Sequence, residues 1–180
     1  MPLVSMRQLL DEAARGGYGV GAFNVNNMEQ IQAIMEAARE TASPVIIQAS
    51  RGARSYTNDR FLWHLMQAAV ELYPEIPVSL HLDHGNEPAT CISAIDLGFT
   101  SVMMDGSLEG DGKTPASFEY NVAVTKEVVE YAHARGVTVT RGEVAVAIQV
   151  GEEKLGRGAH ARVGEEVLEG PRQALCLPLA

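Results

Sequence analysis

Cysteine is scarce in this 180-residue sequence, which contains only Cys91 and Cys176. Two cysteines this far apart do not form a disulfide scaffold, and their scarcity fits a reducing cytoplasm. No run of apolar residues approaches the roughly 18 that a membrane span requires. Residues 1–7 lack the basic start and apolar stretch of a secretory signal peptide. These absences predict a soluble cytoplasmic protein with no membrane partner.

Basic residues are also few, with 14 Lys and Arg against 23 Asp and Glu, which gives a formal net charge of −9. A protein that binds nucleic acid or an anionic membrane first needs a basic surface, so we expect neither partner. A local basic pocket for a phosphorylated small molecule remains compatible with this charge. Apolar residues make up 46% of the chain, enough for the packed core of about one domain.

Apolar runs alternate with amphipathic stretches over the first three-quarters of the chain. The runs predict five strands, near residues 19–24, 44–50, 78–84, 100–105 and 137–139. Alternating strands and helices are typical of parallel βαβ units. The strands are almost continuously apolar, which predicts a parallel sheet covered on both faces. A doubly wound sheet and a (β/α)₈ barrel both fit this pattern.

The ends of the strands favour the barrel. No Gly-x-Gly-x-x-Gly turn follows the first strand, which weakens the dinucleotide-binding form of the doubly wound fold. Polar, reactive residues lie at strand ends instead: Asn24, Ser50, Asp83 with His84, and Asp105. In a barrel these ends converge on one mouth, where the active site lies. Because a complete barrel needs about 250 residues, we predict an α/β fold containing about the first half of a (β/α)₈ TIM barrel.

The composition changes near residue 140. All ten aromatic residues lie at or before Tyr131, and no clear strand or helix period follows residue 140. We therefore predict a boundary between residues 1–139, the N-terminal part of the barrel, and residues 140–180, an anomalous tail. An irregular but genuine C-terminal segment is the alternative.

The string His-Leu-Asp-His-Gly at residues 81–85 carries the strongest chemical signal. Neutral imidazole is the commonest metal ligand, and a neighbouring carboxylate can supply or take a proton. Taken alone, the string fits satisfied polar groups at a strand end equally well. Asp105 at the end of the next strand favours a site, because a second carboxylate at a crowded mouth needs a cation to offset it. Ser50 and Asn24 fit ordinary turn roles better than binding roles on their own.

Several strings resemble the zinc-dependent class II fructose-bisphosphate aldolases, and most closely the branch found in Calvin cycle operons of autotrophic bacteria. The resemblance covers about residues 1–139 and is carried by residues 22–27, 44–50, 78–85, 101–107 and 111–125. It implies a dimeric or larger barrel enzyme of glycolysis, gluconeogenesis and the Calvin cycle. The implied reaction is the reversible cleavage of fructose 1,6-bisphosphate to dihydroxyacetone phosphate and glyceraldehyde 3-phosphate, through an enediolate that zinc stabilises.

The resemblance also implies roles for individual residues. His84 matches a ligand of the catalytic zinc, and Asp83 matches the acid/base that protonates the aldehyde oxygen during condensation. Asp105 matches a ligand of a second divalent metal position. Ser50 matches a contact to glyceraldehyde 3-phosphate, and Asn24 lies where the family has an amide in the substrate pocket. Such a lyase requires no lysine Schiff base.

The chain departs from the family pattern after residue 139. The family continues with a Glu-x-Glu-[Leu/Val]-Gly motif, whereas residues 140–145 read Thr-Arg-Gly-Glu-Val-Ala, so Glu143 is not assigned as the metal-binding glutamate. The family's other two zinc histidines have no match. We expect a truncation or a shift of reading frame near residue 140, and no activity from this chain alone. The alternatives are a non-catalytic half-barrel fragment, whose exposed edges drive association, and an aldolase for tagatose bisphosphate.

Overall fold

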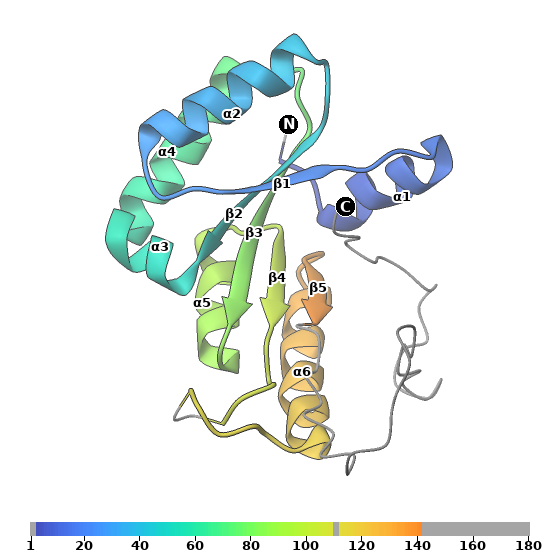
Figure 1. Ribbon diagram of the computed structural model, residues 1–180, viewed down its shortest axis with the longest axis vertical. Coiled ribbons are helices and arrows are strands. Elements are labelled where there is room, and N and C mark those ends of the chain that lie inside the picture. Colours follow the sequence, from blue (N-terminus) through green and yellow to red (C-terminus); the bar gives the residue numbers. More distant parts are fainter. Residues whose placement is uncertain (1–2, 110–111, 142–180) are drawn as a thin grey trace, which may run out of the picture. The chain divides into compact units, whose positions relative to one another are not determined.

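The computed structural model describes residues 3–109 and 112–141, all of which belong to one compact unit, Met1–Val146. Strands and helices alternate along this unit, as predicted (Figure 1). The elements are α1 (Met6–Gly16), β1 (Gly21–Asn24), α2 (Met28–Glu40), β2 (Val45–Ser50), α3 (Arg51–Thr57), α4 (Asp59–Leu72), β3 (Val78–Gly85), α5 (Pro88–Leu97), β4 (Ser101–Met104), α6 (Phe118–His133) and β5 (Thr138–Arg141). None of these helices combines the length and the hydropathy that a membrane span requires.

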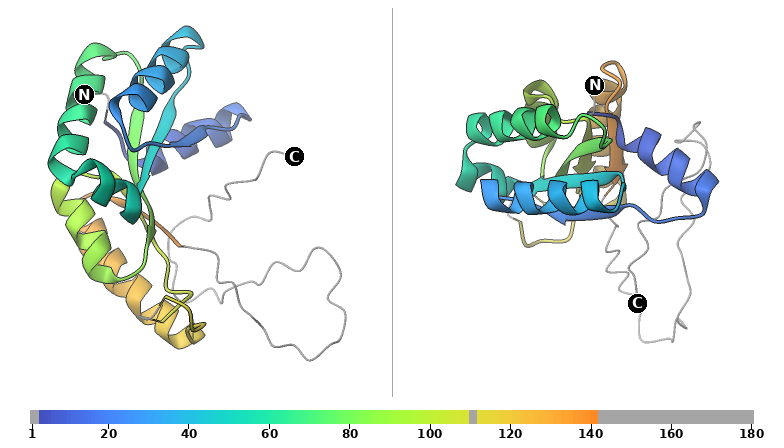
Figure 2. Two further views of the ribbon diagram at one scale, coloured as in Figure 1. Left: turned by 60° about the vertical axis from the view of Figure 1, so that its left-hand side comes forward. Right: turned by 90° about the horizontal axis from the view of Figure 1, so that it is seen from above.

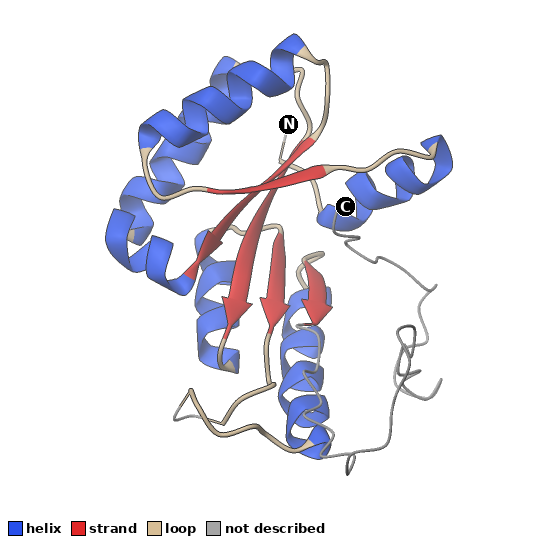
Figure 3. Ribbon diagram, viewed as in Figure 1, coloured by secondary structure: helices blue, strands red, loops and turns tan. Residues whose placement is uncertain are grey.

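The five strands form one sheet in the order β1-β2-β3-β4-β5, and every neighbouring pair is parallel (Figure 3). A doubly wound sheet reverses its strand order at a switch point, and this sheet has no reversal. Helices α2 to α6 follow one another along one face of the sheet, and α1 lies on the other face (Figure 2). This is the arrangement of a (β/α)₈ barrel of which the described residues supply five strands, and the predicted fold class is confirmed.

The two faces of the sheet differ in polarity, which corrects the prediction of strands that are apolar on both sides. Side chains on the face toward α2–α6 are apolar and buried, including Val45, Ile47, Leu80 and Val102. The opposite face corresponds to the interior of a barrel and carries the polar residues Gln48, Ser79, His81, Ser101 and Thr138. The alternation was not recognised because Ile46 and Met103 place apolar residues on this second face as well.

Helix α1 lies across the second face at the amino ends of the strands. Ser5 caps the helix in a reciprocal capping box with Gln8, as the sequence predicted for a helix start. Met6 and Leu9 are buried against Ile46 of β2 in a small apolar cluster. The backbone N–H of Arg7 donates to Thr138 Oγ1 of β5 at 3.3 Å. Helix α1 thus ties β2 to β5 at the end of the sheet opposite the strand ends that carry the predicted site.

Two local predictions were wrong. The helix expected from Pro115 begins at Phe118, with Ser117 as its cap, because Pro115 instead pairs with Leu108 in an antiparallel bridge. A separate helix, α3, was also missed between β2 and α4. It is held by Arg54, which is buried although charged.

Arg54 connects three helices behind the sheet. Its guanidinium donates two hydrogen bonds of 2.8 Å to the carboxylate of Asp59 in α4. It also donates to the Thr90 carbonyl at 3.2 Å and to Ser93 Oγ at 3.1 Å, both in α5. Such a paired and fully hydrogen-bonded arrangement is what permits a charge to be buried. Arg54 therefore fixes the spacing of α3, α4 and α5.

Candidate active site

The predicted site residues lie at the carboxyl ends of adjacent parallel strands. Ser50 of β2 is the Cα partner of Asp83 in β3. The backbone N–H of Asp105, directly after β4, donates to the Gly85 carbonyl at 2.8 Å. Asn24 ends β1 beside Gln48 of β2. The structure therefore brings these strand ends to one edge of the sheet, where barrel enzymes keep their active sites.

A β-bulge at the end of β3 places Asp83 and His84 on the same side. Leu82 pairs with Val102, and Gly85 pairs with Met104, so β3 spends three steps where β4 spends two. The extra residue accommodates His84 in the left-handed region, with φ of 56°, a conformation that costs a residue with a Cβ about 1–2 kcal/mol. In a regular strand two successive side chains point to opposite faces. Here His84 Nε2 lies 3.7 Å from Asp83 Oδ1, so the bulge brings an imidazole next to a carboxylate.

His84 is oriented by Asp105. Its Nδ1 lies 2.7 Å from Asp105 Oδ2, and the backbone N–H of Ser107 donates to Asp105 Oδ1 at 3.2 Å. Burial raises the pKa of Asp105, but the hydrogen bonds from Ser107 and His84 outweigh burial and hold that pKa below its usual range. Since an ionised carboxylate only accepts hydrogen bonds, Nδ1 carries the proton. The neutral ring then has its lone pair on Nε2, the form in which histidine binds metals.

Asp83 is held by Gln48, a residue that the sequence analysis did not single out. Gln48 Nε2 donates to Asp83 Oδ2 at 3.5 Å across the β2–β3 pair, while Asp83 Oδ1 is the oxygen nearer His84. The Asp83 side chain is 18% exposed, and that of His84 is 62% exposed. Gln48 lies two residues before Ser50 and therefore on the same face of β2. That spacing was the available signal for Gln48.

Ser50 has a structural role at this edge. Its Oγ accepts a hydrogen bond from the Ala53 backbone N–H at 3.1 Å and caps α3. The hydroxyl hydrogen is not used by this cap and can donate to a ligand. Asn24 is exposed at the end of β1. The turn roles favoured from sequence thus fit Ser50, and its position beside Asp83 leaves a binding role open to it as well.

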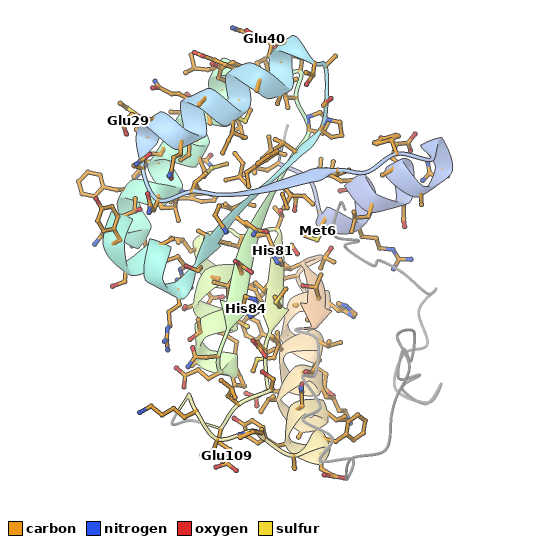
Figure 4. All side chains as sticks on the ribbon, in the orientation of Figure 1. Met6, Glu29, Glu40, His81, His84 and Glu109 are labelled. Atoms are coloured by element: carbon orange, nitrogen blue, oxygen red, sulfur yellow. The ribbon has the colours of Figure 1, made fainter. Side chains whose placement is uncertain are left out.

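The two histidines of residues 81–85 have different environments, although both lie along β3 (Figure 4). His81 is buried on the inner face, and its Nδ1 lies 2.8 Å from Ser101 Oγ. Burial, with a smaller contribution from the charge of His84, lowers the pKa of His81 to about 4, although the hydrogen bond with Ser101 opposes this. His81 is therefore a neutral, satisfied core group, and His84 is the exposed imidazole of the pair.

Two glycines allow helices to pack closely behind the site. A Cβ on Gly85 would overlap Cys91 Sγ of α5 and lie 2.9 Å from the Met103 carbonyl oxygen. A Cβ on Gly106 would lie 2.8 Å from Val124 Cγ2 of α6. Any larger residue at these positions would have to displace α5 or α6. The glycines after His84 and Asp105 are thus explained by packing.

The described residues do not form a complete metal site. Over residues 3–109 and 112–141 no group of three or more His, Cys, Asp or Glu side chains is arranged to hold an ion. A catalytic zinc site normally has three protein ligands, whereas this edge offers the His84 imidazole and the Asp105 carboxylate, which are hydrogen-bonded to each other. Glu143 lies outside the described residues.

Comparison with known proteins identifies the family. The family model described as "Fructose-bisphosphate aldolase class-II" matches residues 4–168. Fructose-bisphosphate aldolases from Nostoc sp. PCC 7120 and from Synechocystis sp. PCC 6803 are each 59% identical, over 97% of this chain and 50% of their own length. A fructose-bisphosphate aldolase from Pseudomonas aeruginosa is 63% identical over 139 residues, which are 77% of this chain and 39% of that protein.

Solved structures agree with these relatives. The crystal structure of the YdjI aldolase from Escherichia coli K12 is 31% identical with a TM-score of 0.68, over 77% of this chain and 51% of that chain. A putative fructose-1,6-biphosphate aldolase from Coccidioides immitis is 32% identical with a TM-score of 0.66, over 76% and 45% of the two chains.

The extent of these matches bears on the length of the chain. The chain spans about half the length of the curated relatives it matches. The family match runs to residue 168, past the point near residue 139 at which the sequence analysis ended the resemblance, while the Pseudomonas alignment covers 139 residues. The boundary at residue 139 stays a prediction. With a family match over residues 4–168, the chain belongs to the class-II fructose-bisphosphate aldolase family.

Proposed function

We propose that this chain supplies the acid/base side of an active site that reversibly cleaves fructose 1,6-bisphosphate to dihydroxyacetone phosphate and glyceraldehyde 3-phosphate. The observation that supports the proposal most strongly is the bulge in β3, which sets Asp83 and His84 side by side at the strand ends with Asp105 oriented on His84. A strained backbone conformation at such a position is typical of functional sites. Relatives named fructose-bisphosphate aldolase at 59% identity support the choice of substrate.

In this proposal Asp83 moves the proton of the reaction. During cleavage its carboxylate takes the proton of the substrate hydroxyl that becomes the aldehyde, as the adjacent carbon–carbon bond breaks and its electron pair stays on the dihydroxyacetone phosphate part. During condensation the same carboxyl returns the proton to the aldehyde oxygen. Gln48 holds Oδ2 of Asp83, so Oδ1 is the oxygen available for proton transfer. Ser50 and Asn24, at the ends of β2 and β1, would bind the phosphorylated sugar.

The cofactor that we propose is zinc, with His84 as one ligand and Asp105 at a second divalent position. The described residues do not complete such a site, because a catalytic zinc needs three protein ligands and only these two donors lie together at this edge. The remaining donors would come from outside residues 3–109 and 112–141. The proposed place of action is the cytoplasm, in glycolysis, gluconeogenesis or the Calvin cycle. We accordingly expect no turnover by the 180-residue chain alone, even with added zinc.

A chimera tests this proposal. Residues 1–139 of this chain, followed by the remainder of the Synechocystis relative, should cleave fructose 1,6-bisphosphate in a zinc-supplemented assay that couples triose phosphate formation to NADH oxidation. Loss of a positioned acid/base typically costs about 10²- to 10⁴-fold, so Asp83→Asn should lower kcat by that factor, and His84→Ala should lower zinc content. Glu36→Gln, which removes an exposed carboxylate from α2, is the control. A folded, zinc-loaded chimera without activity would contradict the proposal.

A further inference from the structure

The free edge of β1 is an unpartnered surface. β1 and β5 end the strand order, and within the described part of the chain no strand pairs with the side of β1 that faces away from β2. All four residues of β1 are exposed. Three large apolar side chains along this segment are about half exposed: Tyr18 at 46%, Phe23 at 47% and Met28 at 47%. The edge therefore offers both free backbone groups and apolar side chains.

This edge carries none of the usual protections of a sheet edge. Residues 17–28 contain no Asp, Glu, Lys, Arg, His or Pro. Soluble proteins place charges, prolines or covering segments on strand edges, because an unprotected edge pairs with other chains. An uncharged stretch of this length, flanked by exposed aromatic residues, indicates an edge that is covered in the working protein.

The backbone of each terminal strand shows which groups are available. The Val25 N–H donates to the Gln48 carbonyl at 2.9 Å, and residues alternate in direction along a strand. The N–H groups of Ala22 and Asn24 therefore point away from β2. On β5 the Thr138 N–H donates to the Thr100 carbonyl at 3.2 Å, so the Val139 N–H points away from β4. The two edges present backbone groups at the same spacing of two residues.

We propose that a second copy of this chain covers the edge, with β5 of one copy adding in parallel to β1 of the other. β1 and β5 are both four residues long, and every pairing within the sheet is parallel. A strand added in this direction continues the sheet, and the reciprocal contact covers both edges of both copies in a closed two-fold pair. The pairing uses only the edges of the sheet and does not depend on the proposed aldolase activity.

The first test is the mass of the purified 180-residue chain by light scattering after size exclusion at micromolar concentration. We expect about twice the 19.3 kDa of one chain. Ala22→Pro removes an N–H from the free edge and leaves the β1–β2 ladder intact, so the mass should fall by half. Ala22→Val keeps the N–H and should remain a pair. Phe23→Lys, which places a charge on the same edge, should also give a single chain and serves if Ala22→Pro does not fold by circular dichroism.

The second test distinguishes β5-to-β1 pairing from β1-to-β1 pairing. A tagged Ala22→Pro copy has an intact β5 edge, so it should retain untagged wild-type chain on an affinity resin, and it should not retain untagged Ala22→Pro chain. The same experiment can be carried out with Phe23→Lys. The proposal is wrong if the wild-type chain is monomeric or forms open assemblies larger than a pair. It is also wrong if the pair survives both edge variants, or if the tagged variant fails to retain wild-type chain.

Discussion

Gly85 is the position at which the site is most sensitive to a single added methyl group. Gly85→Ala places a Cβ in overlap with Cys91 Sγ, 2.9 Å from the Met103 carbonyl oxygen and 3.1 Å from Leu82 Cδ2. Overpacking a close-packed site costs about 1–3 kcal/mol. Because the Met103 carbonyl is backbone and cannot rotate away, we expect the upper half of this range, about 2–3 kcal/mol.

Urea unfolding followed by circular dichroism measures this cost. With an m-value of about 2 kcal/mol/M, the midpoint should fall by about 1 M urea at unchanged m. Gly19→Ala is the matched control, since its Cβ would have no neighbour within 4 Å and the substitution should be neutral or slightly stabilising.

The double variant Gly85→Ala/Cys91→Ala identifies the cause. Removing the sulfur relieves one of the overlaps, so the cost of Gly85→Ala should be smaller in the Cys91→Ala background, by about 1 kcal/mol as is typical of residues in contact. The contact with the Met103 carbonyl remains, so rescue should be partial. If Gly85→Ala is as stable as Gly19→Ala, α5 does not pack against the end of β3 as described, and the explanation of the bulge is wrong.

Two further predictions concern buried groups. His81 has a pKa of about 4 when folded against 6.5 when unfolded, so the unfolded chain binds the proton first as the pH falls. Stability should therefore be lost between pH 6.5 and pH 4, by about 3 kcal/mol at 1.4 kcal/mol per pKa unit; urea titrations should show this loss reduced in His81→Gln and unchanged in His64→Gln. Arg54→Met leaves the Asp59 carboxylate without its partner and should cost about 3–5 kcal/mol by thermal or urea unfolding, whereas Arg51→Met on the exposed side of α3 should cost little. A cost for Arg54→Met no larger than for Arg51→Met would contradict the clamp.

The order of strands and helices could be predicted from sequence because each βα unit is encoded locally. Apolar runs at residues 44–50 and 78–84 became β2 and β3 with shifts of one residue at most, and Ser5 and Asn27 cap helices as expected. Parallel strands deliver their ends to one edge, so the gathering of Ser50, Asp83 and Asp105 followed from the fold class alone.

The features that the sequence did not reveal depend on contacts between distant segments. The bulge at His84 is defined only by the register of β3 against β4, and Gln48 gains its role from Asp83, 35 residues away. Arg54 has the appearance of a surface residue until α4 and α5 enclose it. Pro115 fits the first turn of a helix, but its pairing with Leu108 across the loop delays the helix to Phe118.

A crystal structure of the 180-residue chain tests the central claim most directly. The account predicts one extra residue in β3 between Leu82 and Gly85, a positive φ at His84, and His84 Nδ1 within hydrogen-bond distance of the Asp105 carboxylate with Asp83 beside the same ring. A regular β3, with Asp83 and His84 directed to opposite faces of the sheet, would contradict it.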